Sequence, residues 1–393
     1  MVGLTLLIAL IVLLILNVPV GIALGVASMF ALMVGDTLSL TSIPQALITS
    51  CDSFPILAIP LFILAGDLMG AGGVSRRILD VCNVFFGRIT GGLAIVTVLV
   101  CMFFAAVSGS GPATVAAVGT MVIPTMLKLG YDKSFVLALV ACAGSIGVII
   151  PPSIPMVIFG VSTGTSVTSL FMGGFLPGLL IGFSLIGYCY WFAKKHGYTG
   201  SKEPFDGKKA WAATWEAKWA LINPVIILGG IYAGLFTPTE AAAVAAIYAY
   251  VCGAFIYREL PPKKLIKAIG TSCSTTATTM VILGCATAFT KIITIEQIPT
   301  MVTQMMMTVS DSPVVILLLI NLILLIVGCF MDTTPAILVL APILLPVATS
   351  IGLDPIHFGL IMVTNLAIGF ITPPLGINLF VASRISDSPM EVF

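Results

Sequence analysis

The chain has 393 residues, of which 59% are hydrophobic and 8% are charged, and its formal net charge is +1. A soluble domain carries roughly 25% charged residues, so the composition excludes a water-soluble fold. Without a basic cluster interleaved with aromatic residues, the sequence gives no indication of nucleic-acid binding. The nine cysteines stand apart with no CxxC pair, which favours packing roles over a metal or disulfide framework.

Several uncharged stretches exceed the roughly 20 apolar residues that cross a bilayer as a helix, which predicts an all-α polytopic membrane protein. Two apolar segments, 3–16 and 19–35, open the chain, and we expect each to cross the membrane. The first is not interpreted as a cleavable signal peptide, because it lacks a basic leader and runs directly into the second. One further crossing precedes the stretch Ile89–Leu127.

Two interruptions then break the helical pattern of the first half. The run Ser108-Gly109-Ser110-Gly111-Pro112 divides what would otherwise be one very long helix, and Pro151-Pro152 breaks the next. Broken backbone inside a bilayer is tolerated only where protein or a wet cavity satisfies its polar groups. We therefore interpret the first interruption as the tip of a re-entrant hairpin and the second as a broken helix.

A crossing at 171–193 and a polar stretch at 194–218 link the two halves. Trp211, Trp215 and Trp219 stand four residues apart at its end, which predicts an amphipathic surface helix. The second half then repeats the order of the first. It has two crossings at 219–235 and 239–257, one more crossing, a hairpin tip at Phe330–Pro335 and a helix broken at Pro373-Pro374.

Short sequence matches support an internal repeat. Gly147–Pro152 recurs as Gly369–Pro374 at an offset of 222 residues, and the tip segments match at an offset of 223. We expect two inverted repeats, each with a re-entrant helical hairpin and a broken helix, in an elevator-type, ion-transporter-like fold. The expected parts are scaffold helices at 1–52, a first transport repeat at 53–170, a link at 171–218, scaffold helices at 219–267 and a second transport repeat at 268–393.

The distribution of basic residues tests the membrane topology, because cytoplasmic loops collect Lys and Arg. With an external N-terminus and two hairpins that each return to their own side, only Lys291 falls outside. If either hairpin spanned the membrane, every loop after it would move to the opposite side. The residues placed inside are Arg76, Arg77, Arg88, Lys128, Lys133, Lys194, Lys195, Lys202, Lys208, Lys209, Lys218, Arg258, Lys263, Lys264, Lys267 and Arg384.

Two tips and two helix breaks at one depth would surround a cavity with hydroxyls, free carbonyls and helix ends. Such groups suit a dehydrated Na⁺ and an anionic substrate; the alternative is that small residues merely allow close helix packing. The candidate substrate-binding residues are Ser108, Ser110, Ser153, Thr333, Thr372 and Asn378. The candidate Na⁺ ligands are Gly109, Ser110, Gly111, Thr114, Ile149, Pro151, Asp332, Thr334, Gly369, Thr372, Pro373 and Gly376.

Asp332 is the strongest single candidate for a functional residue, because a charged group near mid-bilayer costs free energy unless it is compensated. It could hold a cation, carry a proton or simply cap the following helix. Asp67 is expected nearer the cytoplasmic end of its crossing, in contact with interfacial water. The hydroxyl-rich run at 271–279 either lines the substrate path or bonds the preceding turn of its own helix.

The motifs at Ser108–Thr114, Ile149–Ser153, Phe236–Ala241, Met331–Pro335 and Ile371–Gly376 together resemble the large membrane subunit of tripartite ATP-independent periplasmic (TRAP) transporters. The resemblance covers essentially the whole chain. It implies an elevator-type importer of carboxylate solutes such as sialic acid or C4-dicarboxylates, driven by two or more Na⁺. It also implies a small four-helix membrane subunit, a periplasmic substrate-binding protein and a place in the bacterial inner membrane.

The chain departs from the family pattern in one respect, and two other functions remain as alternatives. Members typically carry one more C-terminal crossing, so we expect the chain to be shortened at this end, and the small subunit to be a separate chain. An intramembrane enzyme is one alternative, but no HExxH, GxSxG or paired intramembrane aspartates are present, and no Walker lysine motif points to ATP. The other alternative is a subunit that only anchors partners, although symmetric broken helices cost stability and would have no function in such a subunit.

Overall fold

The computed structural model describes residues 2–35, 38–200, 205–310 and 312–389, and this part of the chain is all helical. Six of its helical segments are long and apolar enough to cross a membrane, which agrees with a multi-pass membrane protein. These segments are Phe54–Ala71, Val167–His196, Pro238–Ile256, Pro262–Ile295, Pro313–Phe330 and Thr333–Ser350.

Helix α10 (Val167–His196) divides the helices of the described chain into two halves. The first half contains α1 (Val2–Ile15), α2 (Val20–Val34), α3 (Ser42–Cys51), α4 (Ala58–Ala71), α5 (Val74–Phe86), α6 (Gly92–Ser108), α7 (Gly111–Lys128), α8 (Lys133–Ser145) and α9 (Ile154–Thr163). Helix α10 follows. The second half contains α11 (Gly207–Tyr232), α12 (Pro238–Val251), α13 (Pro262–Ile295), α14 (Ile298–Val309), α15 (Pro313–Phe330), α16 (Thr333–Ser350), α17 (Pro355–Gly369) and α18 (Ile377–Ser386).

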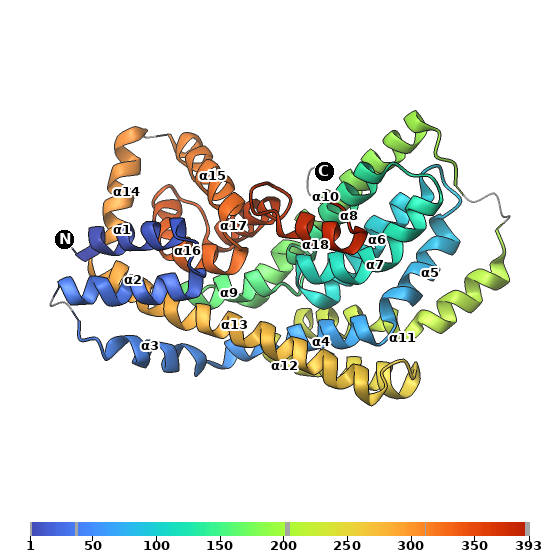
Figure 1. Cartoon of the computed structure of the whole chain (residues 1–393), viewed down its shortest axis with the longest axis horizontal. Helices are drawn as coiled ribbons and strands as arrows, with labels where there is room; N and C mark the ends of the chain where they lie inside the picture. Colours follow the sequence, from blue (N-terminus) through green and yellow to red (C-terminus); the bar gives the residue numbers. More distant parts are fainter. Residues whose placement is uncertain (1, 36–37, 201–204, 311, 390–393) are drawn as a thin grey trace.

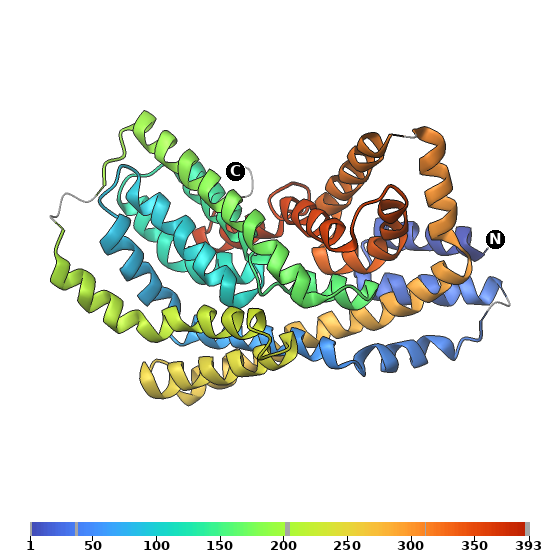
Figure 2. The same cartoon turned by 180° about the vertical axis from the view of Figure 1, so that it is seen from behind.

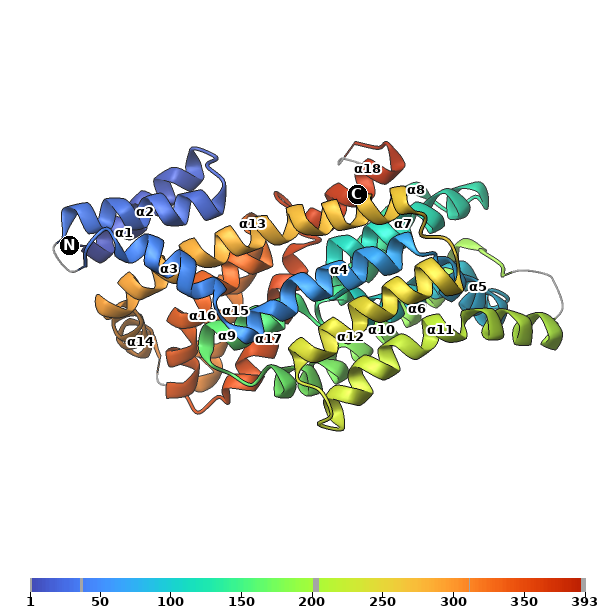
Figure 3. The same cartoon turned by 90° about the horizontal axis from the view of Figure 1, so that it is seen from below.

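Helices α4 and α13 pack side by side and form the axis of the molecule. Figure 3 shows α4 between α13 and α12, while α1 and α2 lie over the other end of α13. The approach of α2 to α13 is close, since a Cβ at Gly21 would lie 2.9 Å from the side chain of Ile282. In each half, the second helix of the opening pair therefore packs against an axial helix of the other half, α2 against α13 and α12 against α4.

The two hairpins, α6–α7 and α15–α16, lie on opposite sides of the molecule with their tips toward its centre (Figure 1). The chain beyond each helix break crosses over to the other hairpin. Helix α9 packs against α16 and α17, and α18 packs against α7 and α8. Both breaks have a cis peptide bond, at Pro151-Pro152 and at Pro373-Pro374.

Helix α10 runs diagonally across the back of the molecule (Figure 2) and contacts both α6 and α17. The structure differs from the sequence-based expectation after this helix. Helix α11 continues unbroken through residue 218, because its tryptophan-bearing first turns and the expected crossing at 219–235 form one helix. Asp206 caps it by accepting from the backbone N–H of Lys208 at 2.9 Å.

Two connecting helices, α5 and α14, were not expected from the sequence. Helix α5 is tied to α11 and the segment after α12 through one side chain, Arg77. Its guanidinium lies 2.8 Å from a carboxylate oxygen of Glu259 and 3.5 Å from one of Glu216, and it covers the ring of Tyr257 at 3.8 Å. Because charged groups pair and stack here, a segment with two consecutive arginines packs as a helix rather than remaining an open loop.

Candidate functional site

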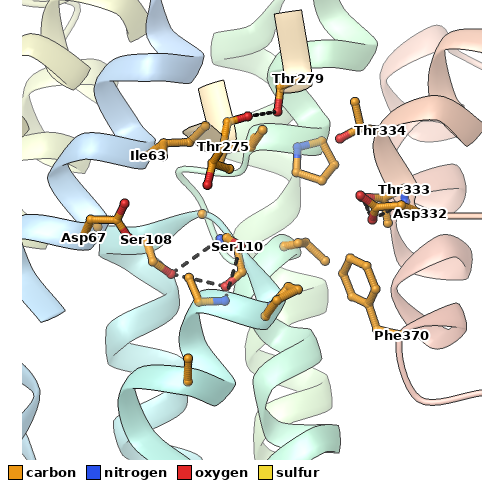
Figure 4. A pocket seen from close by; sticks show the side chains of 18 of the residues that line it. Ile63, Asp67, Ser108, Ser110, Thr275, Thr279, Asp332, Thr333, Thr334 and Phe370 are labelled. Atoms are coloured by element: carbon orange, nitrogen blue, oxygen red, sulfur yellow. Dashed lines mark hydrogen bonds between the residues drawn. The ribbon is translucent and has the colours of Figure 1, made fainter. Parts of the chain in front are cut away.

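A cavity of about 390 Å³ lies where the two hairpin tips face α4 and α13. Figure 4 shows Asp67 and Ser108 on one side of it and Asp332 and Thr333 on the other. Its lining comes from both tips, both breaks and both axial helices. The lining residues are Ile63, Gly66, Asp67, Ser108, Gly109, Ser110, Pro112, Ala113, Ala116, Val148, Ile154, Pro155, Thr271, Thr275, Thr279, Asp332, Thr333, Thr334 and Phe370.

The first tip is a compact turn held by its own hydroxyls. Gly109 ends α6 with φ +62°, a left-handed conformation that favours glycine. Ser110 then caps α7, with its Oγ accepting from the backbone N–H of Ala113 at 3.5 Å. The hydroxyl oxygens of Ser108 and Thr114 are 3.1 Å apart, and Thr114 also donates to the carbonyl of Ser110 at 2.8 Å. The tip thus concentrates oxygen atoms within one turn.

The structure brings this tip together with the first helix break, as the sequence predicted. The backbone N–H of Ile154 donates to the carbonyl of Gly109 at 3.2 Å. A Cβ at Gly147 would lie 2.6 Å from Thr114 Oγ1 and 2.7 Å from the Ser110 carbonyl, so only glycine permits this approach. Ile149 and Pro151 belong to the same break and are buried.

The second tip meets the second break in a similar way. The backbone N–H of Leu375 donates to the carbonyl of Cys329 at 3.0 Å, and a Cβ at Gly369 would lie 2.2 Å from the carbonyl oxygen of Gly328. Asp332 caps α16, with Oδ1 accepting from the backbone N–H of Thr333 at 2.7 Å. The capping interpretation of Asp332 is therefore observed, and the same residue also lines the cavity.

Three of the six candidate substrate-binding residues line the cavity, namely Ser108, Ser110 and Thr333. The other three lie outside its lining. Ser153 is fully buried and donates to the carbonyl of Val148 inside the first break, and Thr372 donates to the carbonyl of Ile368 at 2.8 Å. Asn378 is buried between helices and donates to the carbonyl of Ala141 at 3.0 Å.

Four of the candidate cation ligands line the cavity, namely Gly109, Ser110, Asp332 and Thr334. Gly111 and Thr114 of the first tip and the candidates in the two breaks lie outside its lining. Gly369 lies behind the second tip against Gly328, and Pro373 lies on the exposed side of its break. Gly376 has φ +47° and begins α18. These three residues therefore belong to the backbone of the second break and not to the lining of the cavity.

Asp67 has a role that the sequence did not predict. It lines the cavity, and its Oδ2 accepts from Ser272 Oγ of α13 at 2.6 Å. The available signal was that Asp67 is the only charged residue of the Phe54–Ala71 segment. Its partner lies on a helix distant in sequence, so the hydrogen bond itself had no local signal.

The hydroxyl-rich run on α13 both lines the cavity and bonds the preceding turn of its own helix. Thr271, Thr275 and Thr279 are four residues apart, so they share one helical face, and all three line the cavity. Two of them also bond the preceding turn: Thr271 donates to the carbonyl of Lys267 at 3.0 Å and Thr279 to that of Thr275 at 2.9 Å. Their oxygen atoms still have lone pairs directed at other donors or cations.

The cavity therefore offers hydroxyl oxygens, two carboxyl groups and two helix N-termini, and no lysine, arginine or histidine lines it. Within the described ranges, no group of three or more His, Cys, Asp or Glu side chains is arranged to hold a metal ion. Hydroxyl, carbonyl and carboxylate oxygens suit a hard monovalent cation, and helix N-termini suit an anion.

Comparison with known proteins identifies the family. The model of the DctM component of tripartite ATP-independent periplasmic transporters matches residues 7–393. The chain belongs to this family. It is therefore a component of a transporter and not an enzyme.

Relatives at high identity carry matching names. The isethionate TRAP transporter permease protein DctMQ of Oleidesulfovibrio alaskensis is 50% identical over 378 residues, which are 96% of this chain and 60% of that protein. This chain thus spans less than two thirds of that relative. The C4-dicarboxylate TRAP transporter large permease protein DctM of Vibrio cholerae is 42% identical, over 96% of this chain and 87% of that protein. The sialic acid TRAP transporter large permease protein SiaM of Vibrio cholerae is 38% identical, over 95% and 88%.

A solved structure shares the fold of this DctM-family chain. The Alcanivorax borkumensis YdaH transporter superposes with a TM-score of 0.57 and 16% sequence identity, covering 90% of this chain and 83% of that one. At this identity the match concerns the fold alone.

Proposed function

We propose that this DctM-family chain is the transport subunit of a Na⁺-driven importer of small organic anions. The observation that carries the proposal is the convergence of both hairpin tips, both helix breaks and two axial helices on one oxygen-rich cavity. Broken backbone in a membrane is unfavourable unless it lines such a cavity. The N-termini of α7 and α16, which begin at the two tips, add positive dipole ends beside the oxygen ligands.

The proposed substrate class is a carboxylate, of the C4-dicarboxylate or sialic acid type, because relatives with those names match almost the full chain. Isethionate is the second candidate, because the 50% identical relative is named for it. Isethionate is a sulfonate rather than a carboxylate. Both classes present a negatively charged group of oxygens to helix N-termini and hydroxyls, so one site chemistry serves either.

Two cation sites are proposed, one at each tip. The first uses oxygens of Ser108, Ser110 and Thr114 with carbonyls of the adjacent break, supported by the short distances among these groups. The second uses Asp332 with Thr334 and the second break. A cation at the second site would neutralise a carboxyl group that is otherwise costly within the membrane.

The proposed transport movement displaces hairpins and broken helices as one carrier against a scaffold made largely of α1–α2 and α11–α12. The packing of α9 against the second hairpin and of α18 against the first supports two inverted repeats. A disulfide joining α6 to the neighbouring α11 should then abolish uptake reversibly. Full uptake with the cross-link complete would exclude the movement.

The proposed topology has the N-terminus in the periplasm and residues 194–218 in the cytoplasm, in a bacterial inner membrane. It is supported by the placement of all basic residues except Lys291 on one side. The proposed partners are a small four-helix membrane subunit and a periplasmic substrate-binding protein.

Uptake into proteoliposomes tests the function directly. The chain is reconstituted with its genetically linked small subunit and binding protein, and uptake of succinate, N-acetylneuraminate and isethionate is measured with an inward Na⁺ gradient. We expect uptake of one solute class that collapses when K⁺ replaces Na⁺. Uptake that persists without Na⁺, or that follows an imposed proton gradient instead, would contradict Na⁺ coupling.

A further inference from the structure

A second cavity of about 390 Å³ lies farther along α13, between the scaffold and the carrier. Its polar lining consists of hydroxyls and a single charged side chain, Lys291. The lining residues are Thr49, Ser50, Ser53, Ile56, Val161, Ser162, Leu283, Ala286, Thr287, Thr290, Lys291, Leu338 and Pro342. This cavity was not foreseen from the sequence, because its walls come from four separate segments.

Lys291 has no compensating carboxylate in this cavity. Among the described residues, the ion pairs of the chain are formed by Arg77, not by Lys291. Glu296, the nearest acidic residue along α13, accepts a hydrogen bond from the backbone N–H of Gly3 at 3.1 Å. Asp52 precedes Ser53 in sequence but is not part of the lining. The amine of Lys291 is exposed and keeps its hydrogen-bond donors for another group.

The tip cavity has the opposite polarity. It is lined by the carboxyl groups of Asp67 and Asp332, and no basic side chain faces them. Both cavities use α13 as a shared wall, the tip cavity at Thr271–Thr279 and the second at Leu283–Lys291. With a rise of 1.5 Å per residue, Thr275 and Lys291 are about 24 Å apart along the helix. The charge of Lys291 therefore acts much more strongly in the second cavity than in the tip cavity.

We propose that the second cavity is an entry site for oxyanions, where Lys291 attracts the solute before it reaches the tip cavity. This proposal rests on the proposed import function and topology, in which Lys291 is the one basic residue on the periplasmic side. The substrate class is a carboxylate or sulfonate, which binds an ammonium group through charge-assisted hydrogen bonds. Lys291 raises the affinity for the solute at the periplasmic face. The Na⁺ gradient still sets the direction of net transport.

The local field can be measured without knowing the substrate. In the complete membrane complex, with the native cysteines replaced, a single cysteine is placed at Ser53 or at Thr275. Its rates of modification by an anionic and a cationic methanethiosulfonate are compared in detergent. We expect Lys291→Gln to lower the anionic-to-cationic ratio at Ser53→Cys about tenfold, the size expected for one charge several ångströms away. The ratio at Thr275→Cys should not change.

Three matched variants complete the test. Lys291→Arg should restore the ratio, and Lys263→Gln, on the first turn of the same helix, should leave it unchanged. Asp67→Asn should raise the ratio at Thr275→Cys only. An unchanged ratio at Ser53→Cys in Lys291→Gln would overturn the entry site.

The transport measurement keeps this proposal separate from the proposed function. With succinate as probe, or isethionate if succinate is not taken up, Lys291→Gln should raise the KM of uptake about three- to tenfold, and this difference should shrink as KCl is added. The KM for efflux of the same probe should stay at the wild-type value. Absence of Na⁺-driven uptake in the wild type would defeat the proposed function. Wild-type uptake with an unchanged KM in Lys291→Gln would defeat this inference alone.

Discussion

The two hairpin tips hold similar positions at the tip cavity but are built from different chemistry. The first turns through Gly109 at φ +62° and carries only hydroxyls, three of which are linked to one another or to the tip backbone. The second turns through extended residues, with Met331 at φ −131°, and carries the carboxyl group of Asp332. The first tip depends on its shape, whereas the second depends on a charge. Substitutions should therefore act through conformation at the first tip and through electrostatics at the second.

The largest effect is expected from Asp332→Asn. Asparagine caps a helix about as well as aspartate, so α16 should remain intact while the negative charge disappears. We expect Na⁺-driven uptake to fall at least about tenfold, since tenfold corresponds to only about 1.4 kcal/mol of cation binding. The measurement is uptake as a function of Na⁺ concentration, with the Tm as a check on folding.

Asp354→Asn is the matched control, because Asp354 also caps a helix, with Oδ1 accepting from the backbone N–H of Ile356 at 2.8 Å, but lies outside the cavity. It should retain uptake. Equal losses in both variants would mean that Asp332 acts as a cap and not as a charge.

The next effect concerns the shape of the first tip. In Gly109→Ala, the new Cβ would meet the carbonyl oxygen of Pro152 at 2.7 Å and the residue would keep a positive φ. We expect a loss of about 1–3 kcal/mol in the free energy of unfolding and a lower maximal rate of uptake. Thermal unfolding in detergent gives the first quantity.

Met331→Ala provides the corresponding change at the second tip, where no positive φ is required. A smaller decrease in Tm is expected there. If Met331→Ala lowered the Tm as much as Gly109→Ala, the contrast between the tips would be wrong.

A moderate effect is expected from removing single hydroxyls. Ser110→Ala removes a cap and an oxygen from the first tip, and Thr334→Ala removes an oxygen from the second. Each should raise the Na⁺ concentration for half-maximal uptake by roughly three- to tenfold, as expected for about 1 kcal/mol per hydrogen bond or cap. If neither variant changed this concentration while transport persisted, hydroxyl ligation at the tips would be excluded.

The smallest effect should come from replacing the carboxyl group of Asp67. Asp67→Asn can keep the hydrogen bond from Ser272, so only a change of up to about 1 kcal/mol in stability is expected. The Na⁺ dependence of uptake should not change, in contrast to Asp332→Asn. A Na⁺ dependence altered as strongly as in Asp332→Asn would make Asp67 a third element of the cation site.

The tips and breaks could be predicted because their signals are local. Pro151-Pro152 and Pro373-Pro374 remove backbone donors within apolar runs, and glycine and proline mark the tip at Gly109–Pro112. The sequence order also indicated correctly that each tip meets the break that follows it, as the contact of Gly109 with Ile154 demonstrates.

The remaining features depend on partners that are remote in sequence. The role of Asp67 follows from Ser272 on α13, and the packing of α5 follows from Arg77 meeting Glu259. Asn378 and Ser153 were predicted as ligands from their place near the breaks, and each also donates to a backbone carbonyl in a packed interface. A polar side chain near a helix break satisfies either a ligand or the protein's own backbone, and the sequence alone does not distinguish these outcomes.

The crossing over of α9 and α18 has a consequence for how the chain is made. Helix α18, near the C-terminal end of the described chain, supplies a packing surface for α7 and α8 of the first hairpin. During synthesis the first hairpin therefore enters the membrane long before its partner helix exists. The face of the hairpin that α18 covers therefore stays open until α18 has been synthesised. Packing of this region thus follows the synthesis of a later helix, rather than the addition of finished halves.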